Sequence, residues 1–212
     1  MNYFIVGDIH GCYYTMRQLI DNHWDMSKEK LVILGDMVNK GKHTFAVLEY
    51  LLNLQEKFAE KVLILKGNNE FLFERYYRDP KSITLSVKQK FENYNLDYLQ
   101  VLDWMEDLPH FYENGKVFFS HAGIGIDSYP PVSQKEINIL FNNQELKNID
   151  KMQFIGHSVV DEPTYDSRAN AWFLDTGAGY GKKLTAARTD SDGNVINMIQ
   201  LDVSHKDICK FN

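Results

Sequence analysis

Metal-binding residue types follow short apolar runs of this sequence, and glycine stands beside or close to most of them. The set combines two carboxylates, one amide and three imidazoles, at Asp8, His10, Asp36, Asn68, His121 and His157. This mixture suits Mn, Fe or Zn better than Ca or Mg, which prefer oxygen ligands alone. These six residues are more ligands than one tetrahedral zinc ion can bind. They suit two metals about 3.5–4 Å apart that share a carboxylate, an arrangement used for phosphoester hydrolysis. Asp36, on the strand between the others, is the expected bridge.

Alternating strands and helices must position these residues. Apolar runs that end near glycine predict strands at 3–6, 31–34 and 62–65, and a segment with helical spacing follows each of them. Such units in a row predict a parallel sheet with crossover helices. The carboxyl ends of parallel strands share one edge, where ligands bind in sheets of this kind. We therefore expect the candidate ligands to converge there.

The last third of the chain changes to a β pattern. A hairpin turn signal at 191–194 joins the final pair of runs. The strands expected in the second half lie at 116–120, 153–155, 171–174, 184–189 and 195–201. The first two of them would deliver His121 and His157. The whole pattern predicts an α/β fold in which two sheets pack together with helices outside.

Two further segments are expected to be helical. The range 82–108 has no strand pattern and is predicted to be a helical, cap-like insertion. The range 133–142 is predicted to be a helix that begins with a capping box formed by Ser133 and Glu136. No repeat or flexible linker divides the chain, so we expect a single domain over 1–212.

Composition limits the classes of protein that fit. The chain has 212 residues, 44% of them hydrophobic, and a formal net charge of -6. The acidic balance argues against nucleic-acid or anionic-membrane partners. The sequence has no apolar run of membrane-spanning length and no secretory signal pattern. Because only two cysteines occur, a reducing compartment and a cytoplasmic location are expected.

Five motifs resemble those of one enzyme family. They are GDIHG at 7–11, GDMVNKG at 35–41, GNNE at 67–70, HAG at 121–123 and GHS at 156–158. Their order resembles that of the calcineurin-like metallophosphoesterases, closest to the bacteriophage and bacterial branch of the phosphoprotein phosphatases, which are Ser/Thr phosphatases. The resemblance implies a four-layer α-β-β-α sandwich with two mixed sheets and a pair of divalent metals, Mn before Fe or Zn.

The same resemblance distributes the ligands between the two metals. Asp8, His10 and Asp36 would hold one metal. Asp36 would also hold the second, together with Asn68, His121 and His157. Nuclease-like branches usually carry another histidine where this chain has Val159. Its absence favours the phosphatase and dinucleotide-hydrolase branch and leaves one metal site open.

The chain departs from the family pattern on the side of the leaving group. Asn69 replaces the histidine taken as general acid, and Asn39 replaces the aspartate that orients it. Lys40 and Asn143 stand where the family has phosphate-binding arginines. An amide cannot donate a proton as an acid at neutral pH. Losing a positioned acid typically costs about 10²–10⁴-fold for substrates that need one.

Three interpretations stay open. The protein is a hydrolase of phosphoproteins or of activated phosphates, such as aryl phosphates or dinucleoside polyphosphates, by a metal-bridging hydroxide. Alternatively, His43 or His110 supplies the acid. In the third, the protein is a metal-bound scaffold that lost turnover.

The expected partner is a phosphorylated protein or a phosphate-containing small molecule, and the oligomeric state is open. The catalytic candidates are Asn69, Asn39 and Lys40. The candidates for substrate binding are Lys40, Asn69, Lys66, Asn143 and Arg168.

Overall fold

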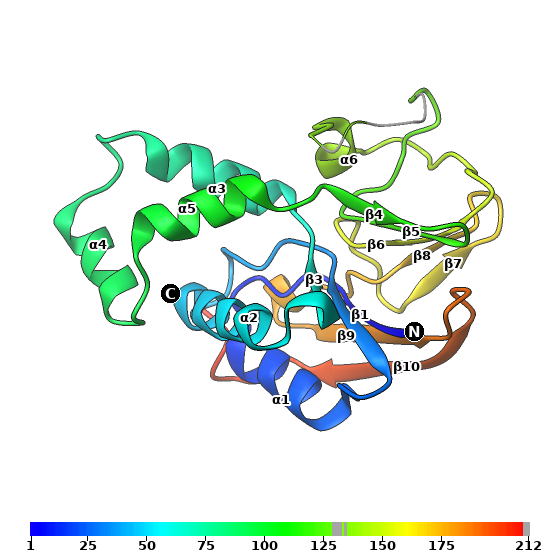
Figure 1. Cartoon of the computed structure of the whole chain (residues 1–212), viewed down its shortest axis with the longest axis horizontal. Helices are drawn as coiled ribbons and strands as arrows, with labels where there is room; N and C mark the ends of the chain where they lie inside the picture. Colours follow the sequence, from blue (N-terminus) through cyan, green and yellow to red (C-terminus); the bar gives the residue numbers. More distant parts are fainter. Residues whose placement is uncertain (129–132, 134, 210–212) are drawn as a thin grey trace.

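A computed structural model describes residues 1–128, 133 and 135–209 and contains two five-stranded sheets (Figure 1). The first sheet has the order β10-β9-β1-β2-β3. Its strands are β1 (Asn2–Val6), β2 (Glu29–Ile33), β3 (Val62–Ile64), β9 (Lys183–Thr189) and β10 (Val195–Asp202). Strands β1, β2 and β3 run parallel, whereas β9 runs antiparallel to both β1 and β10. The predicted parallel unit at the start of the chain is confirmed.

The second sheet has the order β4-β5-β6-β8-β7. Its strands are β4 (Phe111–Glu113), β5 (Val117–Ser120), β6 (Met152–Ile155), β7 (Thr164–Asp166) and β8 (Ala171–Phe173). The inner strands β5, β6 and β8 are parallel, and the edge strands are antiparallel to their neighbours. The sequence pattern did not predict β4 or β7, because each has three residues and too few apolar positions to show a period.

Helices lie on the outer face of the first sheet and beside it, and a short helix lies over the second sheet (Figure 1). They are α1 (Tyr13–His23), α2 (Thr44–Phe58), α3 (Asn68–Arg78), α4 (Leu85–Glu92), α5 (Tyr98–Asp107) and α6 (Asn138–Phe141). Short 3₁₀ turns occur at η1 (Ala59–Lys61) and η2 (Ala178–Tyr180). Helices α4 and α5 occupy the range 82–108, as expected from its pattern, while its role as a cap stays a prediction.

The helix predicted over 133–142 is too long. Residue 134 lies outside the described residues, and the helix that the structure describes, α6, begins only at Asn138. The expected capping-box start at Ser133 is therefore wrong. A four-residue helix gains little from local hydrogen bonding. It is held instead by Ile139, which packs with Phe111 and Phe118 of the second sheet.

Alternation along β1 explains how the layers stack. Tyr3 and Ile5 point into a core that also contains Phe119 and Phe154 of the second sheet. Phe4, on the opposite face, belongs to the core beneath the helices of the first sheet. Successive side chains of a strand point to opposite faces, so one sheet buries both sides. The α-β-β-α arrangement with two mixed sheets is confirmed.

No helix of the described residues is long and apolar enough to cross a membrane.

Candidate metal centre

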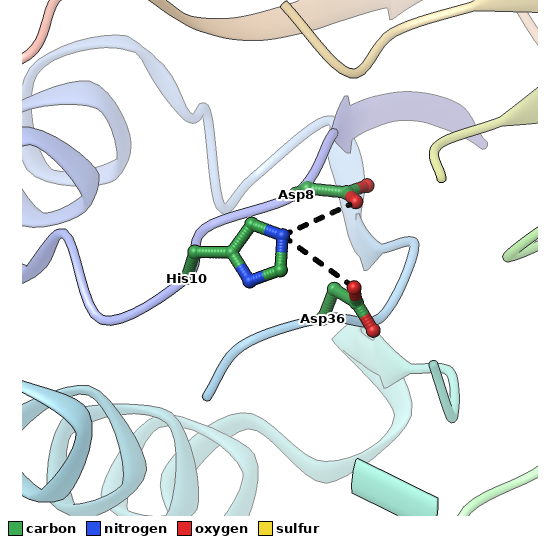
Figure 2. A group of neighbouring side chains, drawn as sticks. All are labelled: Asp8, His10 and Asp36. Carbon is green, nitrogen blue, oxygen red and sulfur yellow. Dashed lines mark ion pairs between the residues drawn. The ribbon is translucent and has the colours of Figure 1, made fainter. Parts of the chain in front are cut away.

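Loops at the carboxyl ends of β1 and β2 bring the first ligand group together. Figure 2 shows His10 between two carboxylates, with Nε2 at 3.8 Å from Asp8 Oδ2 and 3.5 Å from Asp36 Oδ2. One ligand atom from each of the three residues lies within 4.8 Å of the others, and all three side chains are buried. Nδ1 of His10 lies 3.1 Å from the carbonyl oxygen of Val38 and donates to it. The lone pair of His10 is therefore on Nε2, the atom that a metal would take.

A second ligand group adjoins the first. Asn68 Oδ1, at the start of α3, lies 2.8 Å from Nε2 of His121 and 3.0 Å from Nδ1 of His157. His121 Nε2 is also 3.4 Å from Asp36 Oδ1. Asp36 thus faces both groups, one oxygen toward each, in the position expected of a bridge. All six predicted ligands converge at this edge.

The donor atoms of the second group fit a cation between them. Nδ1 of His121 donates to the Leu34 carbonyl at 3.0 Å, which leaves a lone pair on Nε2. That lone pair faces the carbonyl oxygen of Asn68 and a carboxylate oxygen of Asp36. Burial, and then the neighbouring His121, lower the pKa of His157 to about 4, so its ring is neutral at pH 7. His157 Nδ1 also lies 3.2 Å from His121 Nε2, so nitrogen and oxygen atoms that can bind a metal meet at one point.

The electrostatics of the first group also favour a cation. Burial, and then the charges of Asp175 and Asp36, raise the pKa of Asp8 well above its usual value. Burial lowers the pKa of His10, which keeps the imidazole neutral. Burial opposes ionisation of Asp36, but His121, His10 and Asn69 outweigh it, so that its pKa is lowered. A divalent ion would offset the negative charge buried here.

The backbone at this site is held in a conformation that most residues avoid. His10, Asp36 and His157 have φ values of 47°, 50° and 62°. Left-handed conformations in residues other than glycine cost on the order of 1 kcal/mol or more each, and they persist only where the surroundings impose them. In Asp36 and His157, this conformation lies directly after Gly35 and Gly156.

Glu70 is the group that imposes the turn at Asp36, and sequence reasoning assigned it no role. Its carboxylate accepts hydrogen bonds from the backbone N–H groups of Asp36 at 2.7 Å, Met37 at 2.8 Å, Val38 at 3.1 Å and Gly67 at 2.9 Å. Burial, and then the charge of Asp36, raise the pKa of Glu70 to about 7. The available signal was a glutamate three residues after Gly67, the position of the second half of a capping box.

The two asparagines that replace the family's acid pair are in contact. Asn39 Nδ2 donates to Asn69 Oδ1 at 2.8 Å. Asn69 in turn donates to Asp36, from Nδ2 to Oδ2 at 2.5 Å and from the backbone N–H to Oδ1 at 2.9 Å. The two amides thus form a hydrogen-bonded chain that ends on the carboxylate of Asp36. Its catalytic role stays a prediction.

Lys40 lies closer to the metal ligands than the sequence indicated. Its Nζ is 2.8 Å from His10 Nε2 and 4.5 Å from the centre of the Tyr180 ring. Nε2 is the atom that a metal would take. The ammonium group therefore holds the ligand atom of His10 in the structure and must leave it when a metal binds.

The remaining substrate-binding candidates have other neighbours. Lys66 is buried, where burial lowers its pKa, and it donates to the Glu106 carbonyl at 3.5 Å. Arg168 is 77% exposed and pairs with Asp166. Asn143 is exposed after α6. Among the described residues, no hydrogen bond or ion pair connects these three to the ligand groups.

The alternative acids are likewise engaged elsewhere. The Nε2 atom of His43 lies 2.9 Å from the Lys206 carbonyl. His110 is buried, and its Nδ1 lies 2.9 Å from the Glu136 carbonyl. Neither imidazole has a described hydrogen bond to the ligand groups, so the structure gives no support to either as the missing acid.

Comparison with known proteins agrees with this geometry. The calcineurin-like phosphoesterase family matches residues 1–180. The chain belongs to this family. Metallophosphoesterases of this family depend on two metals, and the chain carries a potential metal-binding group at the expected place.

Curated relatives of this metallophosphoesterase carry two kinds of name. "Bis(5'-nucleosyl)-tetraphosphatase, symmetrical" from a Buchnera aphidicola strain is 26% identical over 82% of the chain and 61% of the relative. Another from Buchnera aphidicola is 29% identical over 58% of the chain and 45% of the relative. A catalytic subunit of serine/threonine-protein phosphatase 2B from Saccharomyces cerevisiae is 29% identical over 71% of the chain and 22% of the relative. The chain thus spans about half the length of the first relatives it matches.

Solved structures share the fold of this metallophosphoesterase. A putative diadenosine tetraphosphatase superposes with a TM-score of 0.69 at 20% identity, over 96% of this chain and 94% of that one. A cold-active protein-tyrosine phosphatase from a Shewanella species gives a TM-score of 0.63 at 14% identity, over 96% and 80%.

Gly156→Ala should disable the Asp8 side of the metal centre. A Cβ at this position would lie 2.0 Å from Asp8 Oδ1 and would push the carboxylate out of place. We expect lower manganese occupancy, measured by elemental analysis, together with a lower melting temperature. Gly115→Ala is the matched control, because a Cβ there would meet nothing within 4 Å. Equal metal content in both variants would contradict the assignment of Asp8.

Lys40→Met should increase the affinity of the metallophosphoesterase for manganese. The variant removes a positive charge that lies 2.8 Å from the ligand atom of His10. We expect about tenfold tighter binding by calorimetry, since like charges repel strongly in partly buried sites. Lys42→Met, which removes an exposed lysine nearby, is the control. Weaker binding in Lys40→Met would mean that the ammonium group supports the site rather than competes for it.

Proposed function

We propose that this chain is a dinuclear metal-dependent phosphoesterase that hydrolyses activated phosphates, first among them the anhydride bonds of dinucleoside polyphosphates. Asp8, His10 and Asp36 would hold one metal, and Asp36 with Asn68, His121 and His157 the other, with manganese as the favoured ion. Two bound divalent ions supply a water-derived nucleophile at neutral pH and offset the charge of the phosphoryl group.

The choice of an activated phosphate as substrate rests on the side chain beside Asp36, which is the amide of Asn69. Asn69 holds Asp36 through Nδ2 and the backbone N–H, and its amide has no proton to give to a leaving group. A leaving phosphate oxygen needs little help, because the second pKa of a phosphate ester is about 6. The phenol leaving group of an aryl phosphate, with a pKa of about 10, needs more. The alkoxide of an alkyl ester is the most basic of the three.

The other residues of the site would orient the phosphoryl group. Lys40, once displaced from His10, can place its ammonium against a phosphoryl oxygen, as a point charge rather than the planar fork of an arginine. Asn69 can donate from its amide to the same group. Water would add to phosphorus and release a proton to solvent, the bond between phosphorus and the oxygen shared by two phosphoryl groups would break, and the leaving nucleotide would depart as an oxyanion. The names of the Buchnera relatives support this choice of substrate class.

A phosphoprotein substrate is the second candidate. The sequence motifs placed it first, and the similarity to a yeast serine/threonine-protein phosphatase favours it. Phosphoserine would require another source of the leaving-group proton. A cytoplasmic location, which the two free cysteines fit, also stays a prediction.

Metal analysis combined with a substrate panel tests the proposal. The purified protein is loaded with manganese and assayed with diadenosine tetraphosphate, p-nitrophenyl phosphate and a phosphoserine peptide. We expect bound manganese and turnover in that order of rate. Fastest turnover of the peptide would favour the protein phosphatase. Bound metal with no turnover of any phosphate would favour the interpretation of the protein as a metal-bound scaffold. Absence of metal from the loaded protein would overturn the assignment of the metal ligands.

A further inference from the structure

A cavity of about 280 Å³ opens beside Lys40, on the side away from the carboxylates. It is formed largely by the loop that contains η2 and by the segment that follows β10. Gly179 separates the cavity from the metal centre, since a Cβ there would lie 2.6 Å from both His10 Cδ2 and Lys40 Cδ. The cavity therefore begins where the phosphoryl site ends.

The walls of the cavity are mostly apolar. Buried Cys12, Ala178 and Val203 line it, while the ring of Tyr180 and the side chain of Ile208 are exposed to solvent. Lys40 Nζ lies 4.5 Å from the centre of the Tyr180 ring. The cavity thus offers a flat aromatic surface with a positive charge at its inner end.

The acidic residue of the lining is not available to a ligand. Both carboxylate oxygens of Asp207 accept hydrogen bonds from the start of α1, from the backbone N–H groups of Tyr14 and Thr15 and from the Thr15 hydroxyl, at 2.7–3.0 Å. Lys40 is then the charged group of the lining that can meet a ligand. A cationic ligand would therefore meet no unengaged carboxylate among the described residues of the lining.

We propose that this cavity binds one nucleobase of the substrate, stacked on Tyr180, while Lys40 contacts the phosphate chain that runs to the metal centre. The inference rests on the proposed function and specifies its substrate as a nucleotide. The volume is close to the lower end for small-molecule pockets, about 300–1,000 Å³, and suits a single base rather than a whole dinucleotide. Stacking on an aromatic ring accepts any base, so the cavity would select for nucleotides without selecting among them.

The position of the ring distinguishes a nucleobase from an aryl phosphate. In an aryl phosphate, one oxygen atom separates the ring from phosphorus. Here the ammonium of Lys40 lies 2.8 Å from the ligand atom of His10 and 4.5 Å from the centre of the Tyr180 ring, so it can contact groups at both places. A base that is joined to the reacting phosphorus through ribose and further phosphates can span such a gap.

Calorimetric titration with ATP and with inorganic tripolyphosphate tests the cavity. The two probes share a triphosphate, and only ATP has a base. The full chain loaded with manganese should bind ATP more tightly than tripolyphosphate. Tyr180→Ala should weaken ATP binding about tenfold or more, and tripolyphosphate binding by a smaller factor. Tyr180→Phe, which retains the ring, should keep the preference for ATP. Tyr165→Ala, an exposed tyrosine on β7, is the matched control.

The titrations test the base pocket, and hydrolysis assays on the same protein test the proposed function separately. Equal affinity of the unaltered protein for ATP and tripolyphosphate, or an equal loss of both in Tyr180→Ala, would overturn the base pocket. In a third titration, with phenyl phosphate, a loss of affinity in Tyr180→Ala for this probe but not for ATP would assign the cavity to an aryl substrate and would overturn the base pocket as well. Hydrolysis of diadenosine tetraphosphate and of tripolyphosphate at similar rates would leave the proposed anhydride hydrolysis standing without the pocket. If ATP binds more tightly than tripolyphosphate but neither diadenosine tetraphosphate nor tripolyphosphate is hydrolysed, the proposed function fails and the pocket stands.

Discussion

Asp36→Asn is expected to lower kcat/KM for diadenosine tetraphosphate by about 10³-fold or more. Asp36 lies between the two ligand groups, with Oδ2 at 3.5 Å from His10 Nε2 and Oδ1 at 3.4 Å from His121 Nε2. An amide at this position keeps a similar shape but removes the charge that both metals would share. The measurement is steady-state kinetics in manganese, with the metal content determined on the same preparation.

The control for this variant is Asp192→Asn, at an exposed position of the turn between β9 and β10. It removes the same charge from the chain without touching the metal centre. Far-UV circular dichroism and a melting curve establish that both variants are folded. A folded Asp36→Asn protein with full activity would show that the bridge is not needed, and the two-metal assignment would fail.

Restoring the acid pair should produce a gain of function. In the double variant Asn69→His with Asn39→Asp, a carboxylate would stand where Asn39 now donates to Asn69 at 2.8 Å, and an imidazole would stand beside Asp36. We expect turnover of an alkyl phosphate such as phosphoserine to rise by about 10²-fold, the lower end of the effect of a positioned acid. Turnover of diadenosine tetraphosphate should change far less, because its leaving group requires no proton.

The single variant Asn69→His serves as the control for the pair. Without a carboxylate at position 39, the new imidazole would be less well oriented and less often protonated than in the double variant. The single variant should therefore gain less turnover than the double variant. Equal changes for alkyl esters and anhydrides would mean that the leaving group does not limit turnover. No gain on any ester would place the attenuation elsewhere in the site.

The convergence of the candidate ligands could be predicted from sequence because it depends on chain order. Asp8 and Asp36 follow β1 and β2, which are parallel neighbours. The carboxyl ends of such strands meet whatever the details of packing. His121 and His157 follow β5 and β6, which are parallel neighbours in the second sheet. The sequence pattern also led us to expect that all of these strand ends converge, and in the structure Asp36 faces both ligand groups.

Contacts between loops could not be predicted in the same way. Glu70 closes the turn at Asp36 by accepting four backbone hydrogen bonds, a role that depends on the left-handed conformation of the residue it holds. Lys40 also has a positive φ, at 59°, which directs its side chain toward His10. Single residues in such conformations leave no periodic signal in a sequence.

The sequence by itself determined the α/β class, the six candidate ligands and the replacement of a histidine by Asn69. These follow from apolar periodicity, from residue chemistry and from motif order, which are properties of local stretches of chain. Only the tertiary structure decided that Asn69 donates to Asp36 and that the ammonium of Lys40 contacts Nε2 of His10. It also decided that Tyr180 forms a wall of a cavity beside Lys40. The reason is physical: each of these contacts joins loops far apart in the chain, and their distances are fixed by how the two sheets and their helices pack.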